Sequence, residues 1–107
     1  MISIQDFKKE VLRCAEEIVV KPKEVHLRNM NTKWASCSNK GRLSFSSSLL
    51  NETPDFRTKV IVHELLHIKY PTHGKMFKIL FVSYLRRQGI DCSLKDFNLS
   101  IGEEKTP

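Results

Sequence analysis

At 107 residues, the chain is long enough for one small domain with a modest core, which excludes a catalytic domain joined to a separate recognition domain. Eighteen Lys and Arg against twelve Asp and Glu give a net charge of +6, but the basic residues are scattered, so the charge indicates a solvated surface before it indicates an acidic partner. Three cysteines without a Cys-x-x-Cys pair favour neither a disulfide framework nor a cysteine zinc knuckle. We therefore expect a cytoplasmic, soluble chain with no signal peptide and no membrane span.

The first half of the chain predicts a helix followed by three strands. Ser3 and Asp6 form a capping pair, and apolar residues then recur at helical spacing. Residues 24–28 alternate between polar and apolar side chains, as in a strand with one buried face. Residues 34–38 and 42–46 flank an Asn-Lys-Gly turn, and this pattern predicts a hairpin.

Two further helices are predicted in the second half. Thr53 is a good N-cap with Pro54 at the first helical position, and Pro71 stops that helix. Its own apolar side chains occupy most of its circumference, which is typical of a central, buried helix. Thr72 is then expected to cap a third helix that ends at Gly89.

The buried helix carries the run His63-Glu64-Leu65-Leu66-His67, and His73 follows. Two histidines four positions apart project from one helical face, so both can bind one metal ion while Glu64 reaches a metal-bound water. Burying these groups costs several kcal/mol unless they are paired, and a zinc ion satisfies them together. The sequence predicts His63, His67 and His73 as zinc ligands. Two alternatives stay open, namely hydrogen-bonded core histidines without a metal and His26 or an acid as third ligand.

These elements together predict an α+β fold with a small three-stranded sheet, an N-terminal helix, a buried active-site helix and a third helix that carries the last zinc ligand. Residues 1–90 are expected to form a minimal metallopeptidase catalytic domain. Residues 91–107 are expected to form a C-terminal segment that covers the active-site cleft.

The chain resembles the YgjP-like metallopeptidases and, in length, the minigluzincins of the gluzincin group. The resemblance rests on the run Arg28-Asn-Met-Asn-Thr-Lys-Trp-Ala-Ser-Cys-Ser38, on Gly41-Arg-Leu-Ser-Phe45 and on the histidine motif, in that order, and it covers residues 24–86. It implies a relative of the catalytic domains of membrane-embedded zinc peptidases, with histidine as the third ligand. Gluzincins with a glutamate third ligand carry an aspartate four residues later, where this chain has Phe77, so a partner that orients the zinc histidines is not identified.

The motif and the resemblance predict a zinc endopeptidase that hydrolyses peptide or protein substrates. Glu64 is expected to accept a proton from a zinc-activated water and to pass it to the leaving amine. The resemblance implies that one strand pairs with the extended substrate, and its residues are Arg42, Leu43, Ser44, Phe45 and Ser46. The candidates for stabilising the oxyanion are Tyr84, His26 and Arg86.

The C-terminal segment is apolar enough to dock and carries groups that bind zinc. The resemblance implies a latent enzyme, a zymogen, in which such a group displaces the catalytic water. The candidate ligands are Asp91, Cys92, Asp96, Glu103 and Glu104. The segment can act within its own chain or on a neighbour, so we expect a monomer or a tail-exchanged dimer.

Three other functions fit parts of the sequence. A protease that degrades proteins crosslinked to DNA has a comparable histidine spacing, although only the net charge supports binding to nucleic acid. A nucleotide hydrolase is compatible with the same motif. A permanently capped, zinc-stabilised interaction module is a non-enzymatic alternative, but such a module has no need of Glu64.

Overall fold

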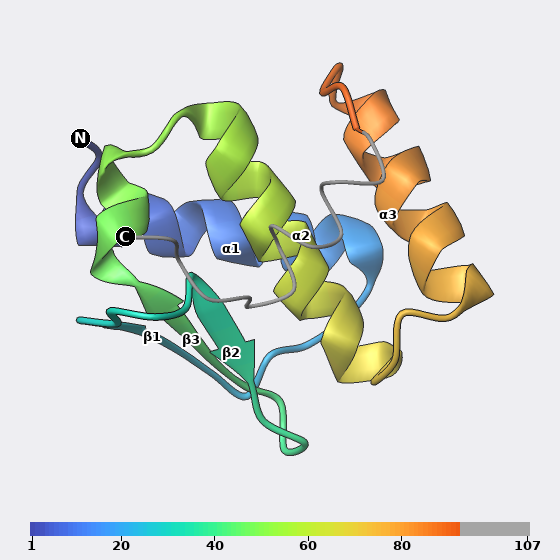
Figure 1. The fold of residues 1–107 in the computed structure, drawn as a ribbon, viewed down its shortest axis with the longest axis horizontal. Coiled ribbons are helices and arrows are strands. Elements are labelled where there is room, and N and C mark those ends of the chain that lie inside the picture. The colour runs from blue at the N-terminus through green and yellow to red at the C-terminus, as the bar shows by residue number, and fades with distance from the viewer. Residues whose placement is uncertain (93–107) are drawn as a thin grey trace.

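The computed structural model describes residues 1–92, which form three α-helices, one 3-10 helix and a three-stranded sheet (Figure 1). The predicted α+β class is confirmed. In chain order the elements are α1 (Ile4–Ile18), β1 (Glu24–Arg28), β2 (Ala35–Cys37), β3 (Arg42–Ser46), η1 (Ser47–Asn51), α2 (Pro54–Lys69) and α3 (Lys75–Arg87).

The first two helices begin at the caps that the sequence predicts. The Ser3 hydroxyl accepts a hydrogen bond from the backbone N–H of Asp6 at 3.0 Å, and the Thr53 hydroxyl accepts one from Phe56 at 3.3 Å. Each cap satisfies a backbone donor that has no partner within its helix. The last helix ends shortly before Gly89, whose φ of 74° is a left-handed conformation that favours glycine.

The third helix begins later than predicted. Gly74, not Thr72, is its N-cap, and no side chain caps its first turn. His73 consequently lies in the turn between α2 and α3 and not on the third helix itself. The turn starts after Tyr70, where Pro71 lacks the N–H that would continue α2.

The strand order is β1-β3-β2, which places β3 at the centre of the sheet. β1 pairs with β3 in parallel, while β2 and β3 form the predicted antiparallel hairpin. The prediction that the substrate pairs with this strand is therefore wrong. The residues named for that role were Arg42, Leu43, Ser44, Phe45 and Ser46. Both edges of β3 are already hydrogen-bonded, so it has no free edge to offer an extended peptide.

α2 is the central element and contacts α1, α3 and β2. Because it is enclosed by other elements, its side chains from Val60 to Leu66 are all buried. The side chains of Leu43 and Phe45, on the inward face of β3, join the same core. Within residues 1–92, no helix combines the length and the apolar character that spanning a membrane requires.

Candidate metal centre and cleft

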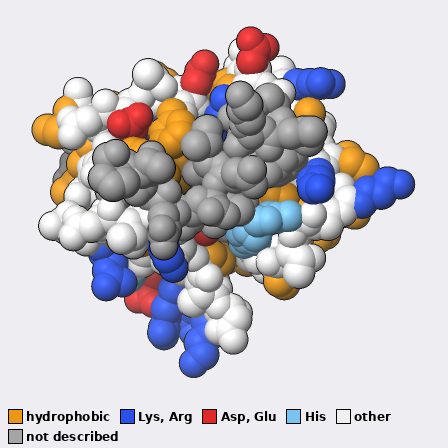
Figure 2. Space-filling model, viewed as in Figure 1, with side chains coloured by type: hydrophobic (Ala, Val, Ile, Leu, Met, Phe, Trp, Pro, Cys, Tyr) orange, Lys and Arg blue, Asp and Glu red, His pale blue; other side chains and the backbone are white. Residues whose placement is uncertain are grey.

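Three imidazole rings meet at the C-terminal end of α2. His63 and His67 lie one turn apart on α2, with ring centroids 4.5 Å apart, and the turn after Pro71 brings His73 to 4.9 and 4.7 Å from them. One ring nitrogen from each histidine lies within 4.8 Å of the others. Tetrahedral zinc with Zn–N bonds of about 2.0 Å places its nitrogen ligands about 3.3 Å apart, so small shifts suffice for binding. Figure 2 shows that histidine side chains reach the surface over this half of α2.

Hydrogen bonds orient two of the rings toward the centre of this cluster. His63 Nδ1 lies 3.0 Å from Glu64 Oε2, and His67 Nδ1 lies 3.1 Å from the backbone oxygen of Tyr70. When each Nδ1 donates its proton, each Nε2 keeps an unshared electron pair, which is the form that binds a metal. Tyr70 thus supplies the orienting partner that sequence analysis did not identify.

The cluster leaves a buried polar atom without a partner. His63 is fully buried, and its Nε2 atom has no hydrogen-bond acceptor or donor. His67 Nε2 and His73 Nε2 face each other at 3.0 Å. Because an unsatisfied buried nitrogen costs free energy, these residues fit a metal ion better than they fit a hydrogen-bonded core.

Burial also keeps two of the three imidazoles, those of His63 and His67, neutral. Desolvation, followed by the proximity of His67 and His73, lowers the pKa of His63 to about 2. Desolvation likewise lowers the pKa of His67, against the hydrogen bond to the Tyr70 carbonyl. Neutral imidazole is the metal-binding form, so little proton competition is expected near pH 7.

Phe77 closes the cluster from the side of α3. Its ring centroid lies 5.0, 4.8 and 4.9 Å from those of His63, His67 and His73. It is fully buried, so it excludes water from one side of the three rings. Phe77 is thus an apolar residue at the position where some gluzincins carry an aspartate. The histidines find their hydrogen-bonding partners on α2 and in the turn that follows it.

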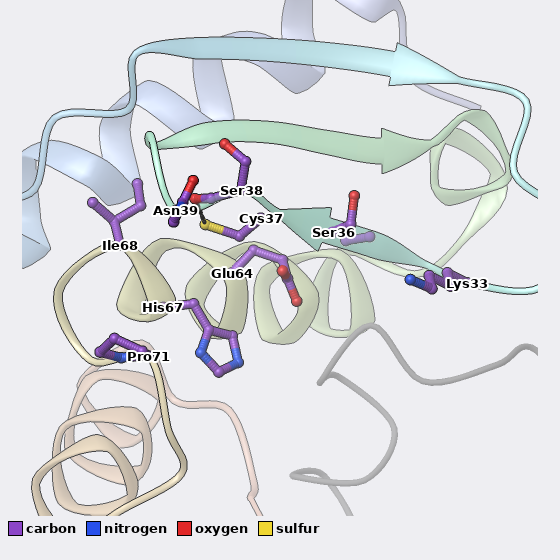
Figure 3. A pocket seen from close by; sticks show the side chains of 10 residues that line it. Lys33, Ser36, Cys37, Ser38, Asn39, Glu64, His67, Ile68 and Pro71 are labelled. Atoms are coloured by element: carbon purple, nitrogen blue, oxygen red, sulfur yellow. Dashed lines mark hydrogen bonds between the residues drawn. The ribbon is translucent and has the colours of Figure 1, made fainter.

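A cleft of about 430 Å³ opens between β2 and α2, and Figure 3 shows it with Glu64 and His67 between its two ends. Its lining residues are Lys33, Ala35, Ser36, Cys37, Ser38, Asn39, Glu64, His67, Ile68 and Pro71. Burial raises the pKa of Glu64 to about 8, and the positive charge of Lys33 opposes that shift. A cation held by the histidines would favour the ionised carboxylate further.

Sequence analysis missed most of the residues that line this cleft. Lys33, Ser36 and Asn39 stand in an ordinary-looking hairpin, and only the Trp-Ala-Ser-Cys-Ser run gave a signal there. Cys37 is half-buried beside them, and burial, followed by the Glu64 carboxylate, raises the pKa of its thiol to about 11. It is therefore a protonated thiol at neutral pH and not an activated nucleophile.

The candidates for oxyanion stabilisation lie elsewhere. His26 is an exposed residue of β1, on the far side of β3 from the cleft, and its ring lies 3.5 Å from the Glu24 carboxylate. Tyr84 is buried against α1, where burial and then the Cys14 thiol raise the pKa of its hydroxyl. Arg86 is exposed near the end of α3. None of the three joins the histidine cluster or lines the cleft.

The candidate latency ligands are only partly described. Asp91 is exposed and Cys92 is half-buried, and neither belongs to the group of three histidines. Asp96, Glu103 and Glu104 lie outside the described residues.

Comparison with known proteins identifies the family. The model of the YgjP-like metallopeptidase domain matches residues 3–87, which include all three histidines and Glu64. The crystal structure of the metallopeptidase zymogen abylysin from Pyrococcus abyssi is similar with a TM-score of 0.64 and 15% identity, over 81% of this chain and 99% of that one, and at this identity the likeness is one of fold. No curated protein matches. Since the family match spans most of the sequence, the chain belongs to the YgjP-like metallopeptidase family.

Proposed function

We propose that this protein is a zinc-dependent peptidase whose metal is held by His63, His67 and His73. The unpartnered Nε2 of His63, in a cluster of three imidazoles, is the observation that carries the proposal. Three histidines that leave a fourth position open are typical of catalytic zinc. Bound there, zinc would supply a Lewis acid for a substrate carbonyl and lower the pKa of water.

Glu64 is the proposed general base and acid. It is nearly fully buried, adjoins the first histidine and lines the cleft, so a carbonyl seated there comes within its reach. Ionised, it accepts the proton of the attacking water, and protonated, it returns that proton to the leaving amine. The hydrogen bond to His63 Nδ1 holds the carboxylate in place between these two steps.

Within residues 1–92, no strand pairs with the edge of β2 that faces away from β3, and this free edge is the proposed site for the substrate backbone. Ser46 N–H donates to the Trp34 oxygen and Ser38 N–H donates to the Arg42 oxygen, so these alternate positions of the hairpin point toward β3. The intervening residues Ala35 and Cys37 therefore aim their backbone groups at the opposite edge, which borders the cleft. An extended peptide can add there as a further strand.

The Glu64→Gln variant tests this function. Gln keeps the size of the side chain but cannot accept a proton, so we expect cleavage of a peptide library to fall by at least about 10²-fold while zinc binding is retained. Zinc content by atomic absorption and cleavage by mass spectrometry are the two readouts. Glu16→Gln, an exposed carboxylate on α1, is the matched control and should cleave like the parent. Measurable cleavage that is equal in the parent and in the Glu64→Gln variant would overturn the proposed role of Glu64.

We further propose that residues beyond Cys92 keep the enzyme latent, acting within one chain or between two chains. The length of that segment, its apolar residues and its potential zinc ligands support this proposal. The crystallised zymogen abylysin, a protein of similar fold, is a further reason to test it. A chain that ends after Cys92 is the sharpest variant, because a cut at Gly89 would also remove Ile90, which is buried.

The shortened chain should cleave peptides faster than the full chain under the same zinc loading. Circular dichroism establishes that it is folded, and size-exclusion chromatography of the full chain separates a monomer from a tail-exchanged dimer. Equal rates for the two folded forms would contradict latency and leave the peptidase proposal intact.

A further inference from the structure

The two ends of the cleft differ in charge. Asn39, Ile68 and Pro71 lie at one end, while Lys33 lies at the other, beyond the start of β2 (Figure 3). Glu64 and His67 lie between them. Among the residues of 1–92 that line the cleft, Lys33 is the one with a Lys or Arg side chain.

The Lys33 ammonium is available to a ligand as far as the structure describes the chain. The side chain is exposed, and within residues 1–92 it forms no ion pair. The carboxylate that lines the same cleft, Glu64, is buried and hydrogen-bonded to His63. A negatively charged group that enters beside the start of β2 therefore meets a cation that forms no ion pair with a described residue.

The direction of β2 decides which part of a substrate reaches Lys33. β2 runs from Ala35 near Lys33 to Cys37 near Asn39. Antiparallel pairing is the more stable mode, so a peptide on the free edge runs from the Asn39 end toward the Lys33 end. With the cleaved bond beside Glu64 and His67, the residues that follow this bond approach Lys33.

We propose that Lys33 selects peptides that carry a carboxylate on the C-terminal side of the cleaved bond. The carboxylate is either an Asp or Glu side chain or the terminal carboxylate of a short peptide. This inference rests on the proposed peptidase function and assigns its substrate class. Lys33 acts as a point charge on a flexible stem, so it tolerates either source and several positions along the peptide.

The expected preference is modest because Lys33 is exposed. A solvent-exposed ion pair contributes little, so we expect cleavage of an acidic peptide to exceed that of its neutral match by about threefold in kcat/KM. The preference should shrink at high salt, since screening weakens exposed charge pairs most. Lys33→Gln should remove it. Lys33→Glu should reverse it, so that peptides with Lys at the same position are cleaved faster.

The experiment uses the zinc-loaded full chain and the zinc-loaded chain that ends after Cys92. Both receive fluorescence-quenched peptides that differ at one position on either side of the bond, where Glu, Gln or Lys is placed. A second set compares free and amidated C-termini, which separates the two carboxylate sources. Lys40→Glu is the matched control, because Lys40 is an exposed lysine of the same hairpin that does not line the cleft.

The preference for acidic peptides should change in the Lys33 variants and stay unchanged in the Lys40→Glu variant. Cleavage with no preference, with a preference that Lys33→Glu leaves unchanged, or with a preference only on the N-terminal side would overturn this inference alone. Absence of cleavage by the parent and by the chain ending after Cys92, with zinc bound, would overturn the proposed function and this inference with it.

Discussion

Each half of α2 buries side chains that carry or can acquire a charge. The two halves differ in whether these side chains find hydrogen-bond partners within the chain. Near the N-terminal end, Arg57 makes a two-pronged contact with Glu10 of α1, at 3.1 and 3.0 Å, and donates to the Glu52 backbone oxygen at 2.8 Å. Near the C-terminal end, His63 Nε2 has no partner and the His67 and His73 nitrogens face each other. The first arrangement is complete within the chain, whereas the second leaves a buried nitrogen that a bound ligand would satisfy.

The polar group at one end of α2 therefore serves the fold, whereas those at the other end are candidates for function. The Arg57 pair joins α1 to α2 and holds the helix that presents the histidines. The histidine cluster contributes little to the stability of the metal-free fold, because the Nε2 atom of the fully buried His63 has no hydrogen-bond partner there. Changes at the two ends should therefore have separable effects on stability and on metal binding.

Zinc should give the largest effect. A free zinc concentration about a thousand times Kd stabilises the folded chain by about 4 kcal/mol, which corresponds to a shift in Tm on the order of 20 °C. His73→Ala should abolish most of this response with little change in the metal-free Tm, since His73 is a half-buried residue of a turn. Thermal unfolding with and without zinc measures both.

His26→Ala is the control for this prediction, because His26 is exposed and lies apart from the cluster. It should keep the full zinc response. A zinc response that survives in the His73→Ala variant would contradict the three-histidine site.

Replacing Arg57 should give the next largest effect. Arg57→Ala leaves Glu10 without its partner and should destabilise the chain by about 2–3 kcal/mol, less than a fully buried pair would because the Glu10 side chain is 24% exposed. Urea unfolding of the metal-free protein measures the loss. Kd for zinc in the folded fraction should stay unchanged.

The double variant Glu10→Leu with Arg57→Met sharpens the comparison, since apolar residues of similar volume often replace a buried pair without loss. It should be more stable than the single variant. A single Arg57→Ala variant as stable as the parent would show that the pair does not hold α1 to α2.

The pH dependence of the metal-free chain should give the smallest effect. Between about 6.5 and 8, folded Glu64 keeps a proton that the unfolded chain releases, so stability should fall with rising pH by about 1.4 kcal/mol per pH unit. Below about 4.5, the unfolded chain binds a proton on His63 that the folded chain excludes, so stability should fall with falling pH. Between these ranges the two contributions cancel.

Glu64→Gln should remove the alkaline decline and keep the acid one, as measured by urea unfolding across pH in the presence of a chelator. Chelation keeps zinc from changing the protonation of both groups. An alkaline decline of equal slope in the parent and in this variant would assign it to another group.

Local chemistry made several elements of this fold predictable. Ser3 and Thr53 cap their helices because the first backbone N–H groups of a helix have no acceptor within it and a side-chain oxygen supplies one. Pro71 ends α2 because it lacks an N–H. Helical spacing alone places His63 and His67 on one face. Thr72 is an equally good cap by composition, but the chain bends at residues 71–72 and the helix begins only after Gly74.

The edges of the sheet were not predictable in the same way. Alternating polar and apolar residues report which face of a strand is buried, but not which edge is paired, so the pattern in residues 42–46 could not show that β3 is central. The cleft residues Lys33 and Asn39 are joined to Glu64 by packing of β2 against α2, and nothing in their own sequence records that contact.

The sequence by itself determined which side chains of α2 meet at the candidate site, because the pitch of one helix places His63 and His67 on a common face with Glu64 beside them. Only the tertiary structure decided which strand edge borders them, that Tyr70 orients His67, that Phe77 walls the cluster and that Lys33 stands at one end of the cleft. Spacing within a helix is a local property of the backbone, whereas contacts between elements depend on how the whole core packs.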